Sequence, residues 1–298
     1  MKNKSAFFIA FILGVVLPML LLRMMPTVEK KEYKSFNIRV FNENKTEIMD
    51  INDYLVGVLL YEMPGDFELD ALRAQAVAAR TFALYDTSKH ESNAVCTESI
   101  CCQGYISPDE YLSAGGSVDV VTKMIEAVRS TDGEVLVYNG ELIEATYFAS
   151  AGGRTESAVD VWGEDVPYLQ SVESEEGDRT HTTQIALKDF CVTLGIANAD
   201  LHVDDVTHTY GGGIESITIN GKSFTGTQLR KVLGLRSTQI ELQFTEDSVI
   251  VTTRGYGHRV GMSQYGANAM AIEGADYIDI LEHYYTGALV CRYNDNDN

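Results

Sequence analysis

One carboxylate in this sequence stands where a side chain can keep its proton near neutral pH. Glu62 follows an apolar helical pattern, and Pro64 and Gly65 end that helix within three residues. A carboxyl in the last helical turn faces the negative end of the helix dipole, and the neighbouring Tyr61 and Met63 shield it from water. Both effects raise a carboxyl pKa, as general acid catalysis requires. The alternative is a solvated glutamate near a helix end.

Two helices must position this glutamate, one on each side of the break, within residues 50–84. The first carries apolar side chains at helical spacing and has Asn52 as its candidate cap. The second carries a stripe of alanines, which predicts close packing against a neighbouring element. Arg80 and Gln75 also lie on the second helix.

A polar stretch without periodicity, residues 87–105, carries His90, Cys96 and Cys102 at equal intervals, together with Cys101. Thiolates with an imidazole are typical zinc ligands, although this spacing is not that of a common zinc finger. A long loop without regular structure inside a compact domain needs a cross-link that holds it in place. The pattern therefore favours a structural zinc site. A disulfide from Cys96 to Cys101 or Cys102, and unbridged thiols, are the alternatives.

Two glycine-rich segments are candidates for ligand contact. Residues 149–156 follow a predicted strand, and their small side chains let a ligand approach the backbone closely. Residues 254–267 contain His258 and open a predicted helix. This segment lacks the lysine and the final serine or threonine of a P-loop, so it gives little support to nucleotide binding. His258 can be a ligand, an acid or base, or a hydrogen-bonded structural group.

The acidic composition of the chain limits the kinds of molecule that it can bind. The chain has 298 residues, with 43 acidic and 23 basic side chains and a formal net charge of −20. This charge argues against binding nucleic acid through a general basic surface. The number of cysteines is odd, at five, which excludes a complete intrachain disulfide framework.

The first residues predict attachment to a membrane. An uncharged apolar run over residues 5–22 follows Lys2 and Lys4 and has about the minimum length of a membrane-spanning helix. Positive charge before it places the remainder of the chain outside the cytoplasm. No small-residue cleavage motif follows, so we expect an uncleaved single-pass anchor at residues 1–25 rather than a removed signal peptide. Residues 26–35 form a linker, and residues 294–298 a disordered tail.

The remaining pattern predicts an α+β fold, in which helices and antiparallel hairpins surround a substrate groove. Residues 36–293 form this domain, with one or two lobes. The Asn139-Gly140 and Asn220-Gly221 pairs favour hairpin turns. We expect an exposed acidic segment at 172–183 and a flexible joint at 211–213. The expected helices are 118–130, 183–194, 227–235 and 276–285, and the expected strands are 36–41, 134–138, 141–148, 214–219, 222–225, 241–244 and 248–253.

Three separated blocks resemble the stage II sporulation protein D family. The first is YEMP at 61–64 with LRAQAVAART at 72–81. The second is SAGGRTE at 150–156 with VWG at 161–163 and PYL at 167–169. The third is GYGH at 255–258 with VGMSQYGA at 260–267. Their order and length make the resemblance specific, and it covers about residues 36–293.

The resemblance implies a lytic transglycosylase that cuts peptidoglycan glycan strands during forespore engulfment in sporulation. Its substrate is glycan stripped of stem peptides by a partner amidase, stage II sporulation protein P (SpoIIP), in a complex with the membrane protein SpoIIM. Glu62 matches the catalytic acid of the family. Some clostridial members hold zinc with one histidine and two cysteines, and His90, Cys96 and Cys102 match that arrangement. Candidates for binding substrate are Gln75, Arg80, Tyr147, Ser150, Glu156, His258, Ser263 and Gln264, with Arg80 or Arg154 facing the lactyl carboxylate of muramic acid.

Two other functions are consistent with the sequence. One is a non-catalytic glycan-binding module that activates a partner cell-wall amidase, as related family members do. The other is a zinc hydrolase that uses a metal-bound water at His90, Cys96 and Cys102. A structural metal is favoured over a catalytic one, because two thiolates lower the Lewis acidity of zinc.

Overall fold

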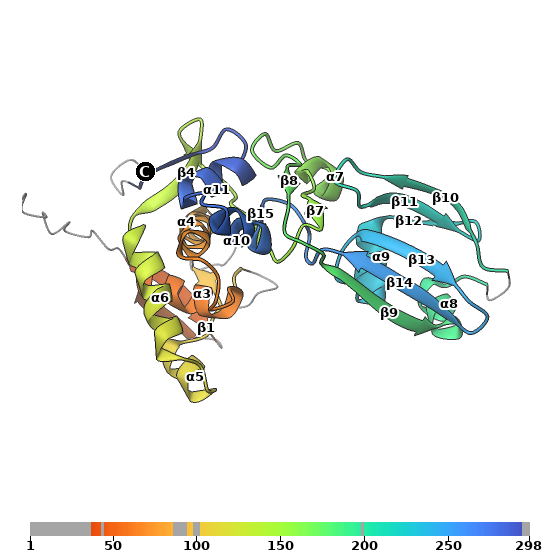
Figure 1. Ribbon diagram of the computed structural model, residues 1–298, viewed down its shortest axis with the longest axis horizontal. Helices are drawn as coiled ribbons and strands as arrows, with labels where there is room; N and C mark the ends of the chain where they lie inside the picture. Colours follow the sequence, from red (N-terminus) through yellow and green to blue (C-terminus); the bar gives the residue numbers. More distant parts are fainter. Residues whose placement is uncertain (1–36, 43–44, 86–93, 98–101, 198–199, 294–298) are drawn as a thin grey trace, which may run out of the picture. The chain divides into compact units, whose positions relative to one another are not determined.

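The computed structural model describes residues 37–42, 45–85, 94–97, 102–197 and 200–293 (Figure 1). Contacts divide the chain into residues 1–34 and 35–298, and every described residue lies in the second unit. This unit mixes helices with mainly antiparallel sheets, so the predicted α+β class is confirmed for it. The predicted anchor, linker and tail lie outside the described residues. Within the described ranges, no helix is both long and apolar enough to cross a membrane.

The first part of the domain is mainly helical. Its elements are β1 (Asn37–Asn42), β2 (Lys45–Asp50), α3 (Ile51–Glu62), α4 (Leu69–Tyr85), β3 (Val95–Cys96), α5 (Pro108–Ser113), α6 (Val118–Ser130), β4 (Glu134–Tyr138), β5 (Glu141–Leu142) and β6 (Tyr147–Phe148). The order β2-β1-β3 forms one small sheet, and β16-β4-β5 forms another.

The second part contains most of the strands. Its elements are β7 (Gly153–Arg154), α7 (Ala158–Trp162), β8 (Glu173–Ser174), β9 (Thr180–Ala186), α8 (Leu187–Leu194), β10 (Val203–His208), β11 (Ile214–Ile219), β12 (Lys222–Phe224), α9 (Gly226–Leu233), β13 (Gln239–Phe244), β14 (Ser248–Arg254), β15 (Met262–Ser263), α10 (Gln264–Ile272), α11 (Tyr277–Tyr284) and β16 (Leu289–Arg292). The sheets are β10-β11-β12, β13-β14-β9, β15-β6 and β7-β8.

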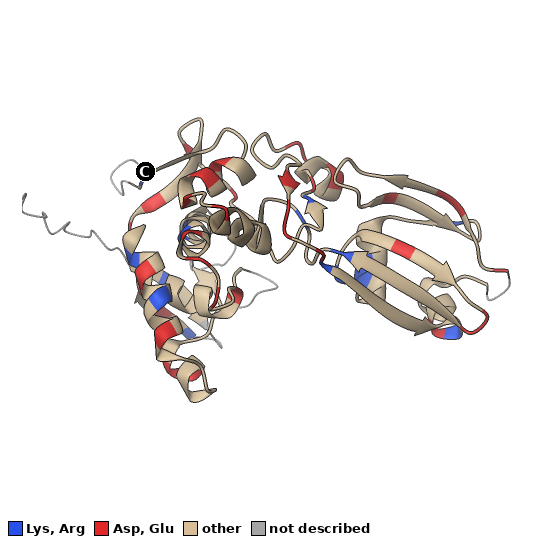
Figure 2. Cartoon of the chain, in the orientation of Figure 1, with Lys and Arg blue, Asp and Glu red and all other residues tan. Residues whose placement is uncertain are grey.

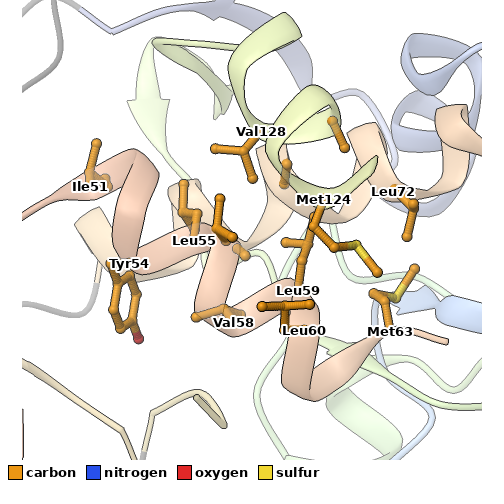
Figure 3. Packing of buried hydrophobic residues seen from close by; sticks show 14 of the residues in the cluster. Ile51, Tyr54, Leu55, Val58, Leu59, Leu60, Met63, Leu72, Met124 and Val128 are labelled. Carbon is orange, nitrogen blue, oxygen red and sulfur yellow. The ribbon is translucent and has the colours of Figure 1, made fainter. Parts of the chain in front are cut away.

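The predicted break after the first helix is present. Helix α3 ends at Glu62, and the N–H of Met63 caps it by donating to the Leu59 carbonyl. The predicted cap at Asn52 is wrong, because Asp50 holds that position and accepts from the Asn52 N–H at 2.8 Å. Figure 3 shows the apolar side of α3 packed against α4 and α6.

Helix α4 is shared by two hydrophobic cores. Ala76 and Ala79 belong to the core that α4 forms with α3 and α6, whereas Ala74 and Ala78 belong to the core that it forms with α10 and α11. All four alanines are fully buried. A helix with larger side chains could not lie so close to neighbours on two sides, so the predicted close packing is confirmed.

A third core lies among the strands of the second part. Phe190 of α8, Leu229 of α9, Ile217 of β11 and Val249 of β14 are buried in it. The predicted helix at 183–194 is wrong in its first part, because Thr180–Ala186 is strand β9 and pairs with β14. Exposure alternates along β9, as in a strand with one covered face. Helix α8 begins only at Leu187.

Some of the other local predictions are confirmed and some are wrong. The two hairpin turns are confirmed, since Asn139 and Asn220 take positive φ angles of 53° and 48°. The residues just before α3 form strand β2, which is not among the predicted strands. The 172–183 segment was expected to be exposed, yet Ser174 and Glu176 in it are buried.

A buried ion pair joins segments that are far apart in the sequence. The side chains of Glu156 and Arg259 are 1% and 0% exposed, and Arg259 Nη1 lies 2.9 Å from Glu156 Oε1. The remaining Arg259 nitrogens donate to the carbonyl oxygens of Ala151, Arg154 and Gly211 at 2.8, 2.8 and 2.6 Å. One guanidinium therefore ties together the loops at 151–156, at 211–213 and around residue 259.

The predicted flexible joint at 211–213 is part of this arrangement. The Gly213 N–H donates to Glu156 Oε1 at 2.9 Å, and Gly211 accepts from Arg259. A Cβ atom at Gly211 would lie 2.5 Å from Glu156 Oε2. Glycine is therefore required here for close approach to the ion pair.

We expect Glu156→Ala to lower the free energy of unfolding by about 3–5 kcal/mol, because Arg259 would keep a buried charge without its carboxylate. Urea denaturation measures the change. Glu47→Ala is the control, since the Lys45–Glu47 pair is 75% and 49% exposed and solvent screens such a pair, so its loss should change stability much less. Similar losses in the two variants would contradict the assigned role of the buried pair.

Candidate functional site

Glu62 lies at the wall of a cavity of about 1030 Å³. The end of α3 brings it there, and the Gly104 N–H donates to its Oε1 at 2.9 Å. The side chain is half-buried, between solvent and the core. This cavity is at the upper end of the range of about 300–1,000 Å³ that ligand pockets occupy.

The environment of Glu62 favours its protonated form. Burial raises the pKa of the carboxyl, while the Gly104 N–H and the side chain of Gln264 oppose that rise. The predicted direction agrees with the structure, and desolvation is its largest cause. Met63 is buried beside Glu62, whereas Tyr61 is 54% exposed and lines the cavity. The site can therefore deliver a proton to a bound molecule.

Aromatic rings line much of the cavity. They are Tyr61, Phe82, Tyr147, Phe148, Trp162 and Tyr256. Trp162 and Tyr256 are 45% and 53% exposed, which is high for such large apolar groups. Aromatic faces offer apolar contact area without closing the site to polar ligands. This lining suits a ligand such as a sugar, with apolar C–H faces and polar edges.

Polar atoms without partners cluster beside Glu62. Within the part of the chain that the structure describes, the Tyr147 hydroxyl, Gln264 Nε2 and both amide atoms of Gln75 are buried and form no hydrogen bond. Burial raises the pKa of Tyr147, the charge of Glu62 adds to the rise and Gln75 opposes it, so these groups are neighbours. Buried polar atoms rarely stay unpaired. Gln75 acts on Tyr147 and Gln264 acts on Glu62, and a ligand or water in the cavity can meet Tyr147 and Gln264. Tyr147 and Gln264 line the cavity, and Gln75 lies behind them with its side chain fully buried.

His258 lines the cavity as a neutral ring. Its Nε2 lies 3.1 Å from the Tyr147 carbonyl oxygen, and its Nδ1 accepts from the Val260 N–H at 3.2 Å. Burial and the charge of Arg230 lower the pKa of the imidazole to about 4. The ring also contacts Phe148 and Trp162. Because backbone groups occupy both nitrogens, His258 shapes the cavity wall and is not set up as a proton donor.

Besides Gln75, four predicted binding residues do not line this cavity among the described residues, and Arg80 is one of them. Its fully buried guanidinium donates to the carbonyls of Glu134 and Val128 and to Asn52 Oδ1, at 3.0, 3.1 and 3.3 Å. It therefore fastens α4 to its neighbours. Glu156, the second of the four, forms the ion pair with Arg259.

Ser150 and Ser263 are the other two. Both hydroxyls donate to the buried carboxylate of Glu176, at 2.5 Å each, and the Gly152 N–H also donates to it, at 2.7 Å. Glu176 therefore joins the loop after β6 to the start of α10. The partners of Ser150 and Ser263 are structural, and sequence reasoning missed Glu176 because it lies in a segment that was expected to be exposed.

Two of the three predicted metal ligands are described. Cys96 is buried in β3 and Cys102 lines the cavity. Burial raises the pKa of the Tyr54 phenol, and the thiols of Cys102 and Cys96 raise it further. Both thiols are therefore near the same side chain. His90 and Cys101 lie outside the described residues, and within the described ranges no three metal-binding side chains come together.

The cavity also contains residues that sequence reasoning did not assign to a site. Trp162 stands in a recognised motif, and its position as the chain's single tryptophan was the available signal. Tyr256 is an exposed aromatic ring in a glycine-rich loop. Arg230 gave no signal, because only the tertiary fold brings α9 to the cavity.

Fold and site together define an α+β protein with a half-buried acid in an aromatic-lined cavity. The family model described as Stage II sporulation protein (SpoIID) matches residues 42–138. Stage II sporulation protein D of Bacillus subtilis (strain 168) is 37% identical over 257 residues, which cover 82% of this chain and 75% of that protein. Its namesake from Bacillus amyloliquefaciens is 35% identical over 260 residues, covering 83% and 75%.

A more distant likeness is to the amidase enhancer of Bacillus subtilis (strain 168). It is 28% identical over 299 residues, which cover 80% of this chain and 40% of that protein. The chain belongs to the stage II sporulation protein D family. The resemblance read from the three sequence blocks is thereby confirmed, and the family's role is in sporulation.

The raised pKa of Glu62 predicts a pH-dependent effect of Glu62→Gln on stability. Below the ordinary glutamate pKa, both side chains are neutral and the two proteins should be equally stable. As pH rises, the wild type must ionise a carboxyl whose pKa is higher in the folded state, so folding loses stability relative to the variant. Urea denaturation at about pH 4 and about pH 8 measures this difference.

Glu110→Gln is a control of opposite sign. The hydroxyl and N–H of Ser107 lower the pKa of Glu110, so this variant should lose stability at neutral pH and recover it in acid. A Glu62→Gln protein that is less stable than the wild type at neutral pH, as Glu110→Gln should be, would contradict the assigned environment of Glu62.

Proposed function

We propose that this protein is a peptidoglycan lytic transglycosylase that cleaves the bond between N-acetylmuramic acid and N-acetylglucosamine in peptide-free glycan strands. The observation that carries the proposal is the position of Glu62, whose pKa is raised by burial at the wall of an aromatic-lined cavity. Membership of a sporulation family supports a role in remodelling the cell wall during engulfment.

The proposed reaction needs one carboxyl group. Protonated Glu62 gives its proton to the glycosidic oxygen, and the bond between that oxygen and C1 of muramic acid breaks. The C6 hydroxyl of the same sugar then attacks C1, and its proton passes to the Glu62 carboxylate, which restores the acid. Hydrolysing glycosidases need a second carboxylate, whereas an internal hydroxyl has a high effective concentration. The product carries a 1,6-anhydro ring, and no water is consumed.

Groups around Glu62 support this cycle. The Gly104 N–H bonds to the carboxylate, and the nearby Gln264 amide also favours the charged form. Both stabilise the anion that remains after proton transfer. Burial opposes them and keeps the acid protonated before the reaction. Tyr147 is in place to meet polar groups of the sugar beside the cleaved bond.

Glu62→Gln should lower the rate of 1,6-anhydro product formation at least about 100-fold, because it removes the proton donor. The assay is mass spectrometry of digests of purified, peptide-free glycan in oxygen-18 water. Wild-type products should contain no label. Glu68→Gln, on the same helical hairpin but exposed and outside the cavity lining, should keep its activity.

Two results would contradict the proposed reaction. Unchanged release of anhydro sugars by Glu62→Gln would exclude Glu62 as the acid. Oxygen-18 at the new reducing ends would show that water attacks C1, as in a hydrolase.

A second candidate function is non-catalytic activation of a partner cell-wall amidase. The name of the amidase enhancer relative favours it, and the aromatic cavity could bind glycan without cutting it. In that case, purified wild-type protein would release no sugar product but would raise the rate of the amidase. We further propose SpoIIP as that amidase and SpoIIM as a membrane partner, with residues 1–25 as a single-pass anchor that holds the domain outside the cytoplasm.

We also propose that His90, Cys96 and Cys102 hold a structural zinc ion. The soft donor set suits zinc, and the two described thiols lie near one tyrosine, Tyr54. When bound, the metal would cross-link the segment between α4 and α5 and contribute folding free energy. No step of the reaction requires it.

Metal analysis and thermal melting test the zinc site. The full chain should contain about one zinc ion per molecule, and chelation should lower its melting temperature. Cys102→Ser should lose the metal, whereas Cys191→Ser, a buried cysteine in a different part of the domain, should keep it. A metal-free protein in which Cys96 and Cys102 resist thiol reagents until reduced would support the disulfide instead.

A further inference from the structure

Arg230 is a cation at the cavity wall that has no ion pair with a described carboxylate. It lies on α9 and lines the same cavity as Glu62. Its Nε donates to the Arg236 carbonyl at 3.3 Å, and among the described residues its guanidinium forms no ion pair with a carboxylate. The chain has 43 acidic and 23 basic residues. An unpaired arginine in such a chain indicates that its partner is a bound anion.

The charge of Arg230 acts inside the cavity. Arg230 is half-buried, and its charge lowers the pKa of His258, which lines the cavity as well. Burial also lowers the pKa of Arg230 itself. Removing water from a guanidinium without an anion is costly. A ligand that brings a carboxylate would offset this cost.

One further basic residue, Arg236, lies next to Arg230. Arg236 stacks over the ring of Tyr256, with 5.5 Å between its Cζ and the ring centroid, and Tyr256 lines the cavity. Figure 2 shows basic residues at the end of β14 and on α9, whereas acidic and basic residues are mixed on other elements such as α6. Arg230 is the one Lys or Arg among the described residues that line the cavity, and Glu144 and Glu164 also line it, so the place for an anionic group is local to Arg230.

The two arginines expected to face muramic acid are occupied elsewhere. Arg80 is fully buried and donates to backbone carbonyls. Arg154 pairs with Glu173 at 2.8 Å and stacks over Tyr210. Neither is among the described residues that line the cavity, whereas Arg230 is.

We infer that Arg230 binds the free lactyl carboxylate of muramic acid and thereby selects glycan without stem peptides. This inference rests on the proposed function. Removal of the peptide leaves a carboxylate, which the planar guanidinium can bind with two parallel hydrogen bonds. A stem peptide turns the same group into an uncharged amide, whose N–H would face the N–H groups of Arg230. The arginine therefore determines specificity, while Glu62 performs the chemistry.

Binding measurements in a Glu62→Gln background test this role without cleavage. The ligands are glycan oligomers with free lactyl carboxylates, the same oligomers with each carboxylate converted to a methylamide, and chitin oligomers of equal length. The full chain in detergent is compared with Arg230→Gln, Arg230→Lys and Lys231→Gln by calorimetry. Lys231 is the matched control, because it is exposed on α9 and does not line the cavity.

The intact site should prefer the carboxylate oligomers to the methylamide oligomers by about tenfold or more. Arg230→Gln should remove this preference and leave the affinity for chitin oligomers unchanged. Arg230→Lys should keep part of it, because the charge remains while the planar fork is lost. Lys231→Gln should bind like the parent protein.

A preference for the carboxylate oligomers that survives in Arg230→Gln would overturn the inference and leave the proposed function standing. Equal losses in Lys231→Gln and Arg230→Gln would also overturn it, since a general charge effect would then explain the preference. If the parent protein binds none of the three ligands, the proposed function fails, and the inference fails with it.

Discussion

The fold around the cavity depends on one buried guanidinium. Arg259 pairs with Glu156 and donates to the backbone carbonyls of Ala151 and Arg154 in the second sequence block and of Gly211 in the 211–213 loop. The residues just before it, Tyr256 and His258, line the cavity. Three loops without regular structure can therefore present side chains in fixed positions, because their backbone oxygens share one donor group.

Two opposing effects set the pKa of Glu62. Desolvation favours the neutral acid, and the Gly104 N–H favours the anion. A group that must first give and then recover a proton needs both. The charges of two other groups in the cavity also differ. His258 stays neutral, and Arg230 carries the positive charge. An acidic protein can thus receive an anionic ligand at one side of one cavity.

Local sequence patterns were enough to predict much of this molecule. The helical break at Glu62 and the turn at Asn139 depend on nearby residues, and both were predicted. Strand β9 was predicted as helix because its pairing with β14 is not a local property. The burial of Glu176 depends on hydroxyl groups distant in sequence, and Arg230 reaches the cavity only through tertiary packing. Side chains whose partners lie far along the chain were therefore the ones that sequence reasoning misplaced or missed.

The central claim is that the fold keeps a proton on Glu62 beyond the ordinary glutamate range. A carbon-13 NMR titration of the side-chain carboxyl groups measures this directly, with the Glu62 signal assigned by its absence from the spectrum of Glu62→Gln. The account predicts that Glu62 titrates at a higher pH than the exposed glutamates of the same protein. A Glu62 signal that titrates with the exposed glutamates, or below them, would contradict it.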